Sequence, residues 1–174
     1  MKNKIIQIML FFIAVVVLSS FASKIASNKS YHLFKIERSK DANEIFYDVN
    51  LDNKSNLDLN NPISIYWIKK TENGKIEPLT WIQKNYAYGI EFLNKSKDQA
   101  EFQFVSYNKR QFQIKKDNNG NFKVYTLSNK RTVIVNRIFI QIDGGTFWFP
   151  KISRVELHAQ DIQTNEKSIE IINP

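Results

Sequence analysis

Apolar and polar residues alternate along most of the chain after residue 30, which is the pattern of β-strands with one buried face. In residues 44–51 at least every second side chain is apolar, so Ile45, Tyr47 and Val49 are expected on one face. Residues 63–70 are apolar on both faces, as is typical of a strand in the middle of a sheet. The strands predicted in this way are 31–38, 44–51, 63–70, 100–107, 111–116, 121–127, 132–142, 152–162 and 167–172.

Residues 77–89 interrupt the alternation and predict a short helix near 78–88. Three apolar residues recur here at helical spacing, and Thr80 and Gln83 have the spacing of a capping box. Gly89 stands where such a helix would end. The sequence thus predicts a mainly β fold, a single antiparallel β-sandwich or partly open barrel of about nine strands with one short helix.

Aromatic residues near this helix are expected to pack in the core or against the helix, among them Trp81, Tyr86 and Tyr88. The chain has only five glycines, so asparagine is expected to take many turn positions that need a positive φ.

The amino terminus has the features of a secretory signal peptide. Lys2 and Lys4 precede an apolar run, and small residues at its end predict cleavage after Ala22. The alternative is an uncleaved membrane anchor, since the run is near the lower length limit for spanning a bilayer. We therefore expect a signal peptide at 1–22, a short linker at 23–30, and one β-rich domain at 31–174 in the periplasm or outside the cell.

The composition narrows the chemistry. There is no cysteine, which excludes disulfides, thiolate metal sites and thiol nucleophiles. The net charge is +8, but the cations are scattered, so no nucleic acid partner is expected. No cofactor or metal is expected either. The partners considered are a glycan, an anionic ligand or an envelope protein, with a membrane met only through the amino-terminal segment before cleavage.

The segment RSKDAN, residues 38–43, allows two interpretations. Its cations could form an anion clamp, because arginine offers a planar fork of donors. The favoured interpretation is a hairpin turn in which Asp41 and Asn43 bond local backbone amides and Arg38 pairs with Asp41 or Glu37. The candidate ligand-binding residues at this hairpin are Arg38, Lys40, Asn43 and Tyr47.

A candidate catalytic group lies in VELHAQD, where His158 has Glu156 and Asp161 nearby. In a strand Glu156 and His158 share a face, so the pair could relay a proton. The chain has only two histidines and no nucleophile-elbow, zincin or phosphate-loop motif. An enzyme is therefore the less favoured class, although dispersed residues can assemble a site.

Consecutive aromatic residues at 147–149 form another candidate. Trp148 and its neighbours could offer an exposed platform for sugar rings or a membrane surface. The favoured interpretation is that they plug the open end of the β-core, because large aromatics rarely remain exposed in patches.

Three blocks carry a resemblance to a known family: LFKIERSKDANEIFYDVN at 33–50, NPISIYWIK at 61–69 and LTWIQKNYAYG at 79–89. Together they resemble the 4833 family of domains of unknown function, an uncharacterised family of exported bacterial domains. The resemblance extends from about Tyr31 to the carboxyl end and implies a known domain type without a mechanism. At Ser55, Ala159 and Asn165 this chain departs from the glycines expected in the family's turns.

The sequence thus favours an exported, non-enzymatic domain that acts in binding or in envelope-associated structure. Two alternatives stay open: a hydrolase-type enzyme with dispersed catalytic residues, and a binder of carbohydrates or anionic surfaces.

Overall fold

The structure is a computed structural model that describes residues 30–146 and 149–173. Within these ranges the chain forms eleven strands, one α-helix and one 3-10 turn. The bounds are β1 Ser30–Arg38, β2 Asp41–Asn50, β3 Ile63–Lys69, η1 Lys70–Glu72, β4 Lys75–Pro78, α2 Trp81–Tyr86, β5 Ile90–Lys95, β6 Gln99–Phe104, β7 Tyr107–Lys116, β8 Phe122–Ser128, β9 Arg131–Gly145, β10 Pro150–Asp161 and β11 Lys167–Ile172.

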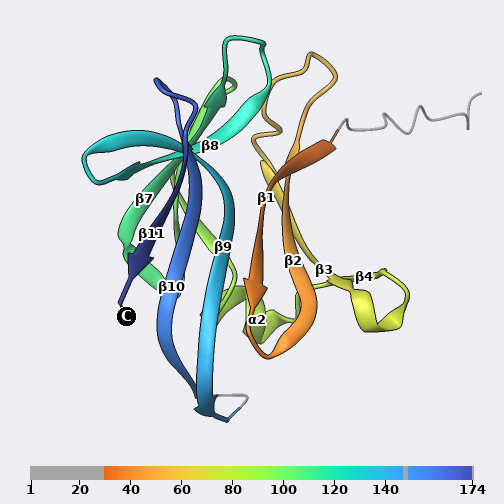
Figure 1. Ribbon diagram of the computed structural model, residues 1–174. Coiled ribbons are helices and arrows are strands. Elements are labelled where there is room, and N and C mark those ends of the chain that lie inside the picture. Colours follow the sequence, from red (N-terminus) through yellow and green to blue (C-terminus); the bar gives the residue numbers. More distant parts are fainter. Residues whose placement is uncertain (1–29, 147–148, 174) are drawn as a thin grey trace, which may run out of the picture.

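Nine strands follow one another in the order β4-β3-β2-β1-β9-β8-β7-β6-β5 and curl into a half-barrel (Figure 1). β10 pairs with the other edge of β9, and β11 pairs with β10. Neighbours are antiparallel except β1 and β9, which run parallel. The predicted mainly β fold with one short helix is confirmed, although β4 and β5 were not among the predicted strands.

The length of β9 explains how the sheet changes direction. Residues 131–134 of β9 pair with β8, and residues 137–140 pair with β1. β10 pairs along 133–145 and therefore occupies the opposite edge of β9 throughout. One strand thus holds two arms of the sheet, β1–β4 and β5–β8, which face each other across the interior (Figure 1).

Aromatic side chains join the two arms. Phe34 of β1 stacks on Tyr47 of β2 with ring centroids 4.4 Å apart, and Phe104 of β6 meets both rings edge-on. The predicted inner face of β2 is confirmed, because Ile45, Tyr47 and Val49 are fully buried. Burial of each large side chain stabilises the fold by about 1.5–3 kcal/mol.

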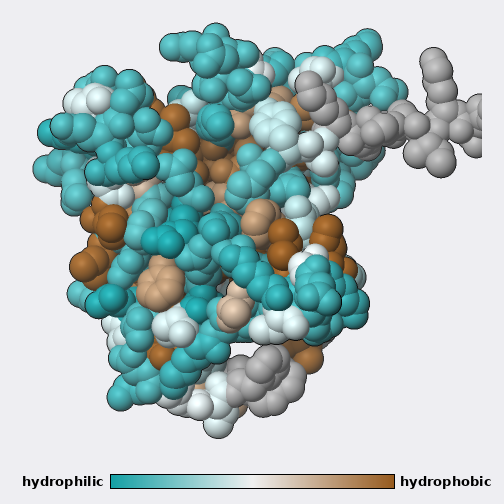
Figure 2. All heavy atoms as spheres, turned by 45° about the vertical axis from the view of Figure 1, so that its right-hand side comes forward, coloured by the Kyte–Doolittle hydropathy of each residue, from teal (hydrophilic) through white to brown (hydrophobic). Residues whose placement is uncertain are grey.

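Figure 2 shows one face of the molecule, on which hydrophilic side chains predominate and hydrophobic ones form small separate groups. No helix in residues 30–146 or 149–173 has the length and apolar character needed to cross a bilayer.

The predicted capping box of α2 is present. The Thr80 side chain accepts a hydrogen bond from the Gln83 backbone amide, and the Gln83 side chain accepts one from the Thr80 amide. Gln83 also accepts from the indole of Trp67, 3.2 Å away, which ties this short helix to β3. The expected core position of Trp81 and Tyr86 is wrong. Each side chain is 68% exposed, and none of the six residues of α2 is buried.

The turns use asparagine as predicted. Asn73, Asn129 and Asn165 all have positive φ, which asparagine tolerates better than most residues. Ser55 also has a φ of 60°, so it holds the left-handed conformation without a glycine.

The two ends of the half-barrel differ. The α2 pole, as we call it, comprises α2, the turns at 39–40 and 105–106, and the tip of the β9–β10 hairpin. A backbone hydrogen bond ties each turn to a neighbouring segment. The Ser39 amide donates to the Ile140 carbonyl of β9, and the Val105 amide donates to the Gly89 carbonyl that follows α2. Ser30, the first described residue, pairs with Asn50 at the opposite pole (Figure 1).

A candidate ligand-binding cavity

A cavity of about 780 Å³ opens at the α2 pole between the two arms of the sheet. Cavities that hold small molecules and cofactors usually measure about 300–1,000 Å³. The apolar side chains that form most of its wall come from β1, β6, β7, β9 and β10. They include Ile36, Phe104, Phe112, Ile138, Ile140 and Leu157.

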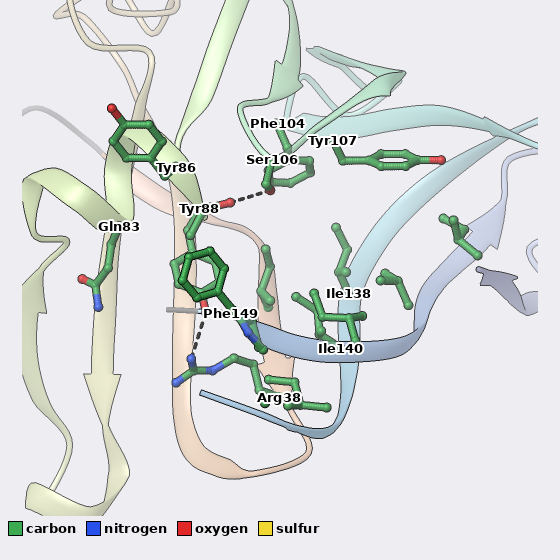
Figure 3. A pocket seen from close by; sticks show the side chains of 18 of the residues that line it. Arg38, Gln83, Tyr86, Tyr88, Phe104, Ser106, Tyr107, Ile138, Ile140 and Phe149 are labelled. Carbon is green, nitrogen blue, oxygen red and sulfur yellow. Dashed lines mark hydrogen bonds between the residues drawn. The ribbon is translucent and has the colours of Figure 1, made fainter. Parts of the chain in front are cut away.

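Strand alternation produces one continuous apolar wall. Ile138 and Ile140 lie two residues apart on β9, so both point to the same face. β10 places Leu157 opposite Ile138 and Val155 opposite Ile140. Figure 3 shows the two isoleucines on the opposite side of the cavity from Tyr88.

Arg38 is the principal polar group at one end of this wall. Its Nη1 donates to the Tyr88 hydroxyl at 2.9 Å (Figure 3). Its Nη2 forms an ion pair with Asp41. The guanidinium carbon also lies over the rings of Trp67 and Tyr88, 4.8 and 5.7 Å from their centroids. Arg38 is thus held in one orientation, and its Nε is buried without a hydrogen-bond partner among the described residues.

Two tyrosines support Arg38. The hydroxyl of the fully buried Tyr47 donates to the Tyr88 backbone carbonyl at 2.7 Å. Burial raises the pKa of Tyr47 well above its ordinary value. Burial also raises the pKa of Tyr88, although the neighbouring Arg38 lowers it in part. Both phenols therefore stay protonated at neutral pH: the Tyr47 hydroxyl donates to the Tyr88 carbonyl, and the Tyr88 hydroxyl accepts from Arg38.

Two other cations line the cavity. Arg110 is bound by the Glu170 carboxylate, so its charge is neutralised locally. Lys40 is exposed at the mouth. Among the described residues of the wall there is no histidine and no carboxylate. The cavity is thus apolar with a cationic and hydrogen-bonding end.

The candidate residues of the RSKDAN segment fall in different places. Arg38 and Lys40 line the cavity, and Tyr47 lies behind it. Asn43 is not part of the wall. Its backbone amide donates to the Asp41 carboxylate, and its side-chain oxygen accepts from the Thr71 hydroxyl. The hairpin is therefore a turn stabilised by Asp41, as favoured, and it also supplies one end of the cavity.

The aromatic candidates at the hairpin tip are only partly described. Phe149 is 82% exposed at the mouth. The expectation that it plugs the open end of the core is therefore wrong. Trp148, the candidate for sugar or surface binding, lies outside the described residues together with Phe147.

The catalytic candidates do not lie at the cavity. Glu156 accepts from His158 at 3.0 Å, so this pair does meet on β10. Arg137 approaches both ring nitrogens of His158 and also pairs with Glu37. Asp161 instead accepts hydrogen bonds from the backbone amides of Gln163 and Thr164.

The ion pairs around His158 belong to a network that runs across four strands, β10, β9, β1 and β2, and ends in the turn η1. It consists of Arg154, Glu156, His158, Arg137, Glu37, Lys35, Glu44 and Lys70. Burial raises the pKa of Glu44, but hydrogen bonds from Lys35 and Lys70 outweigh it and lower the pKa overall. Each charge in the network has an opposite partner, which is the arrangement of a structural surface cluster.

No three histidine, cysteine or carboxylate side chains come together as metal ligands in the part of the chain that the structure describes. The residues that sequence reasoning missed are the hydrophobic wall and Tyr88. The alternation in 132–142 marks Ile138 and Ile140 as sharing a face, but only the pairing of β9 with β1 and β10 shows that this face borders a cavity.

Comparison with known proteins identifies the domain. Residues 34–171, most of the chain, match the family described as Domain of unknown function (DUF4833). No curated protein and no solved structure matches the chain. The resemblance drawn from the three sequence blocks is confirmed as to the family. The chain belongs to the DUF4833 family of domains of unknown function.

Proposed function

We propose that this protein is an exported, non-enzymatic domain that binds an apolar chain with a polar end in the cavity of its half-barrel. The observation that carries the proposal is the cavity of about 780 Å³ with its wall of isoleucine, leucine, valine and phenylalanine. A packing defect in a protein core is far smaller, because interiors are close-packed.

The wall favours an acyl or similar hydrocarbon chain. Each methylene group transferred from water gains about 0.8 kcal/mol, so burial of eight would contribute about 6 kcal/mol. A sugar or nucleotide would leave many hydroxyl groups without partners against such a wall, at a cost for each one.

Arg38 supports a polar end that accepts hydrogen bonds. Its guanidinium is fixed by Tyr88 and Asp41, and its Nε–H has no partner among the described residues. Asp41 offsets much of its charge, so a ligand group would be recognised mainly by hydrogen bonding. A carboxylate, a phosphate or an ester oxygen fits this requirement.

Support for a binding rather than a catalytic role comes from the composition of the wall. General acid–base catalysis needs a titratable group within hydrogen-bond reach of the substrate. The groups that most often serve, histidine and carboxylates, are missing from the described wall, and the His158–Glu156 pair is engaged by Arg137 outside it.

Fluorescence titration with N-phenyl-1-naphthylamine, followed by displacement with saturated fatty acids of increasing length, tests the proposal. We expect enhanced emission and displacement that strengthens with chain length. Ile140→Trp should fill the cavity and weaken probe binding by about tenfold or more, since it removes the space for a hydrocarbon chain.

The matched control is Ile134→Trp. It makes the same exchange on β9 at a partly buried residue outside the wall, and it should leave probe binding unchanged. Equal binding by the Ile140→Trp and Ile134→Trp variants, or no binding by the natural protein, would overturn the proposal.

Export rests on the amino-terminal sequence alone, with its basic start, apolar run and small residues before position 23. Cell fractionation with mass spectrometry of the amino terminus tests it. Recovery of the intact chain in the cytosol would contradict export and leave the cavity proposal standing.

A further inference from the structure

The mouth of the cavity is surrounded by exposed apolar side chains, which we call the mouth rim. Four of its members line the cavity: Ile82 and Tyr86 from α2, and Phe149 and Ile152 from the β9–β10 hairpin. The fifth is the exposed Trp81 of α2, which lies outside the cavity wall and contacts Tyr86. Trp81 and Tyr86 are each 68% exposed and Phe149 is 82% exposed. The ring of Trp81 contacts that of Tyr86 edge-on, so the aromatic surface on α2 is continuous.

The conformation of this rim is fixed by the backbone. Thr146 and Phe149 exchange two hydrogen bonds, one from each backbone amide. Gly145 has a φ of +84°, and a side chain there would collide with the Phe149 carbonyl oxygen. On the other side, the capping box and the Gln83–Trp67 hydrogen bond hold α2 in place.

The side chains of the rim suit a lipid surface. Tryptophan and tyrosine favour the boundary between water and hydrocarbon, because one end of each ring is apolar and the other forms hydrogen bonds. Phenylalanine and isoleucine gain free energy when they leave water for acyl chains. A patch of this kind on a soluble surface marks an interaction site.

The charges around the rim favour an anionic surface. Three exposed lysines lie in its segments, Lys40 in the β1–β2 turn, Lys84 in α2 and Lys151 in β10. An exposed carboxylate, Asp143, lies close to Lys151 and Lys40. Asp41 is engaged by Arg38. Lysine near an anionic membrane contributes about 1 kcal/mol of attraction.

We propose that the α2 pole docks on an anionic phospholipid surface, with the mouth rim inserted at the headgroup boundary and the three lysines over the headgroups. The rim comes from separate segments around an opening, so docking brings the cavity mouth against the acyl chains. If the proposed function holds, on which this last step rests, an acyl chain enters the cavity without crossing water. The favoured expectation from the sequence gave membrane contact only to the amino-terminal segment, and contact through the aromatic residues at 147–149 was the less favoured alternative.

Flotation of the signal-processed protein with vesicles tests the proposal. Vesicles of phosphatidylglycerol and phosphatidylcholine should carry the protein upward at low salt, and vesicles of phosphatidylcholine alone should carry much less. The double variant Trp81→Ser, Phe149→Ser should lower partitioning by about tenfold or more, since two large apolar groups no longer insert. Lys84→Gln and Lys151→Gln should each lower it about fivefold.

Leu127→Ser is the matched control, because Leu127 is 64% exposed at the end of β8 rather than on the rim. It should partition like the natural protein, and circular dichroism should show all variants folded. No binding to anionic vesicles, or equal binding by the rim variant and the control, would overturn the proposal. A dimer that the rim substitutions dissociate would overturn it too, because a second copy would then occupy the rim.

The two proposals fail separately. Ile140→Trp should lose probe binding and keep vesicle binding. Natural protein that binds the probe but no vesicles would contradict the docking proposal alone, and the reverse result would contradict the cavity proposal alone.

Discussion

Arg110 of β7 and Glu170 of β11 form a two-pronged ion pair between strands that share no backbone hydrogen bonds. Nη2 lies 2.5 Å from Oε1 and Nη1 lies 2.9 Å from Oε2, with side chains only 16% and 19% exposed. Nη1 also donates to the carbonyl of Leu127 on β8. Among the described strands β11 pairs only with β10. This contact therefore joins β11, at the edge of the sheet, to β7 in the β5–β8 arm.

Glu170→Gln should lower the free energy of unfolding by about 1–3 kcal/mol, because it replaces a charge-assisted pair with weaker hydrogen bonds and leaves Arg110 without a counter-charge. Urea denaturation measures the difference. Asp98→Asn is the control, since Asp98 pairs with Lys116 at 3.5 Å in an exposed position and should change stability by less than about 0.5 kcal/mol. Equal effects of the two substitutions would show that the Arg110–Glu170 pair adds nothing.

The same pair predicts acid sensitivity. Hydrogen bonds from Arg110 hold the pKa of Glu170 below its ordinary value, and burial opposes this only in part. A carboxyl whose pKa is lowered by folding contributes stability above its unfolded pKa of about 4.3 and loses it as pH falls through the folded pKa. The stability gap between the natural protein and Glu170→Gln, measured by urea denaturation across pH, should therefore be full at neutral pH and shrink below about pH 4.3. A gap that stays constant down to pH 2 would contradict this assignment.

Tyr47→Phe should cost about 0.5–1.5 kcal/mol of stability, because it removes the hydrogen bond to the Tyr88 carbonyl and leaves that carbonyl without this donor. Chemical denaturation gives the stability, and the probe titration gives the effect on the cavity. We expect weaker displacement of the probe by fatty acids as well, since Tyr88 supports Arg38. Unchanged stability would mean that another group satisfies the carbonyl.

Gly89→Ala should displace α2. A Cβ built at Gly89 would lie 1.7 Å from the Lys84 carbonyl oxygen, so the helix must move away, at a cost of about 1–3 kcal/mol. Gly144→Ala is the matched control, because nothing lies within 4 Å of a Cβ there. The fluorescence of Trp81 in α2 and a thermal melt report the change. A melt identical to that of Gly144→Ala would contradict the predicted collision.

Arg38→Met should weaken fatty-acid binding by about tenfold, because the guanidinium supplies the hydrogen bonds for the polar end of the ligand. Binding of N-phenyl-1-naphthylamine, which has no such end, serves as the internal control and should change much less. Displacement titrations measure both. Equal losses for the acid and the probe would show that Arg38 only shapes the cavity.

Local patterns in the sequence predicted much of the fold. Alternation identified the inner face of β2, and the Thr80–Gln83 spacing identified the start of α2, because both depend on neighbours along the chain. The strands β4 and β5 were not predicted. β4 has only four residues, and β5 lies at the edge of the sheet with most of its side chains exposed.

The cavity depends on pairings that local pattern does not contain. Arg38 was a candidate because its type and turn suggested anion binding, and it does line the cavity. The wall at Ile138 and Ile140 requires the parallel pairing of β1 with β9, in which Lys35 and Arg137, 102 positions apart in the chain, lie side by side. Trp81 and Tyr86 were expected inside because they are aromatic, yet α2 is too short to bury them.

The separation of Ser30 from the α2 pole determines where the preceding segment of the chain joins the domain relative to the cavity mouth. β1 spans nine residues, roughly 30 Å, and the described chain begins at one end of it while the mouth lies at the other. Whatever precedes Ser30 therefore joins the domain at the end remote from the opening, so a ligand can reach the mouth without passing the point of attachment.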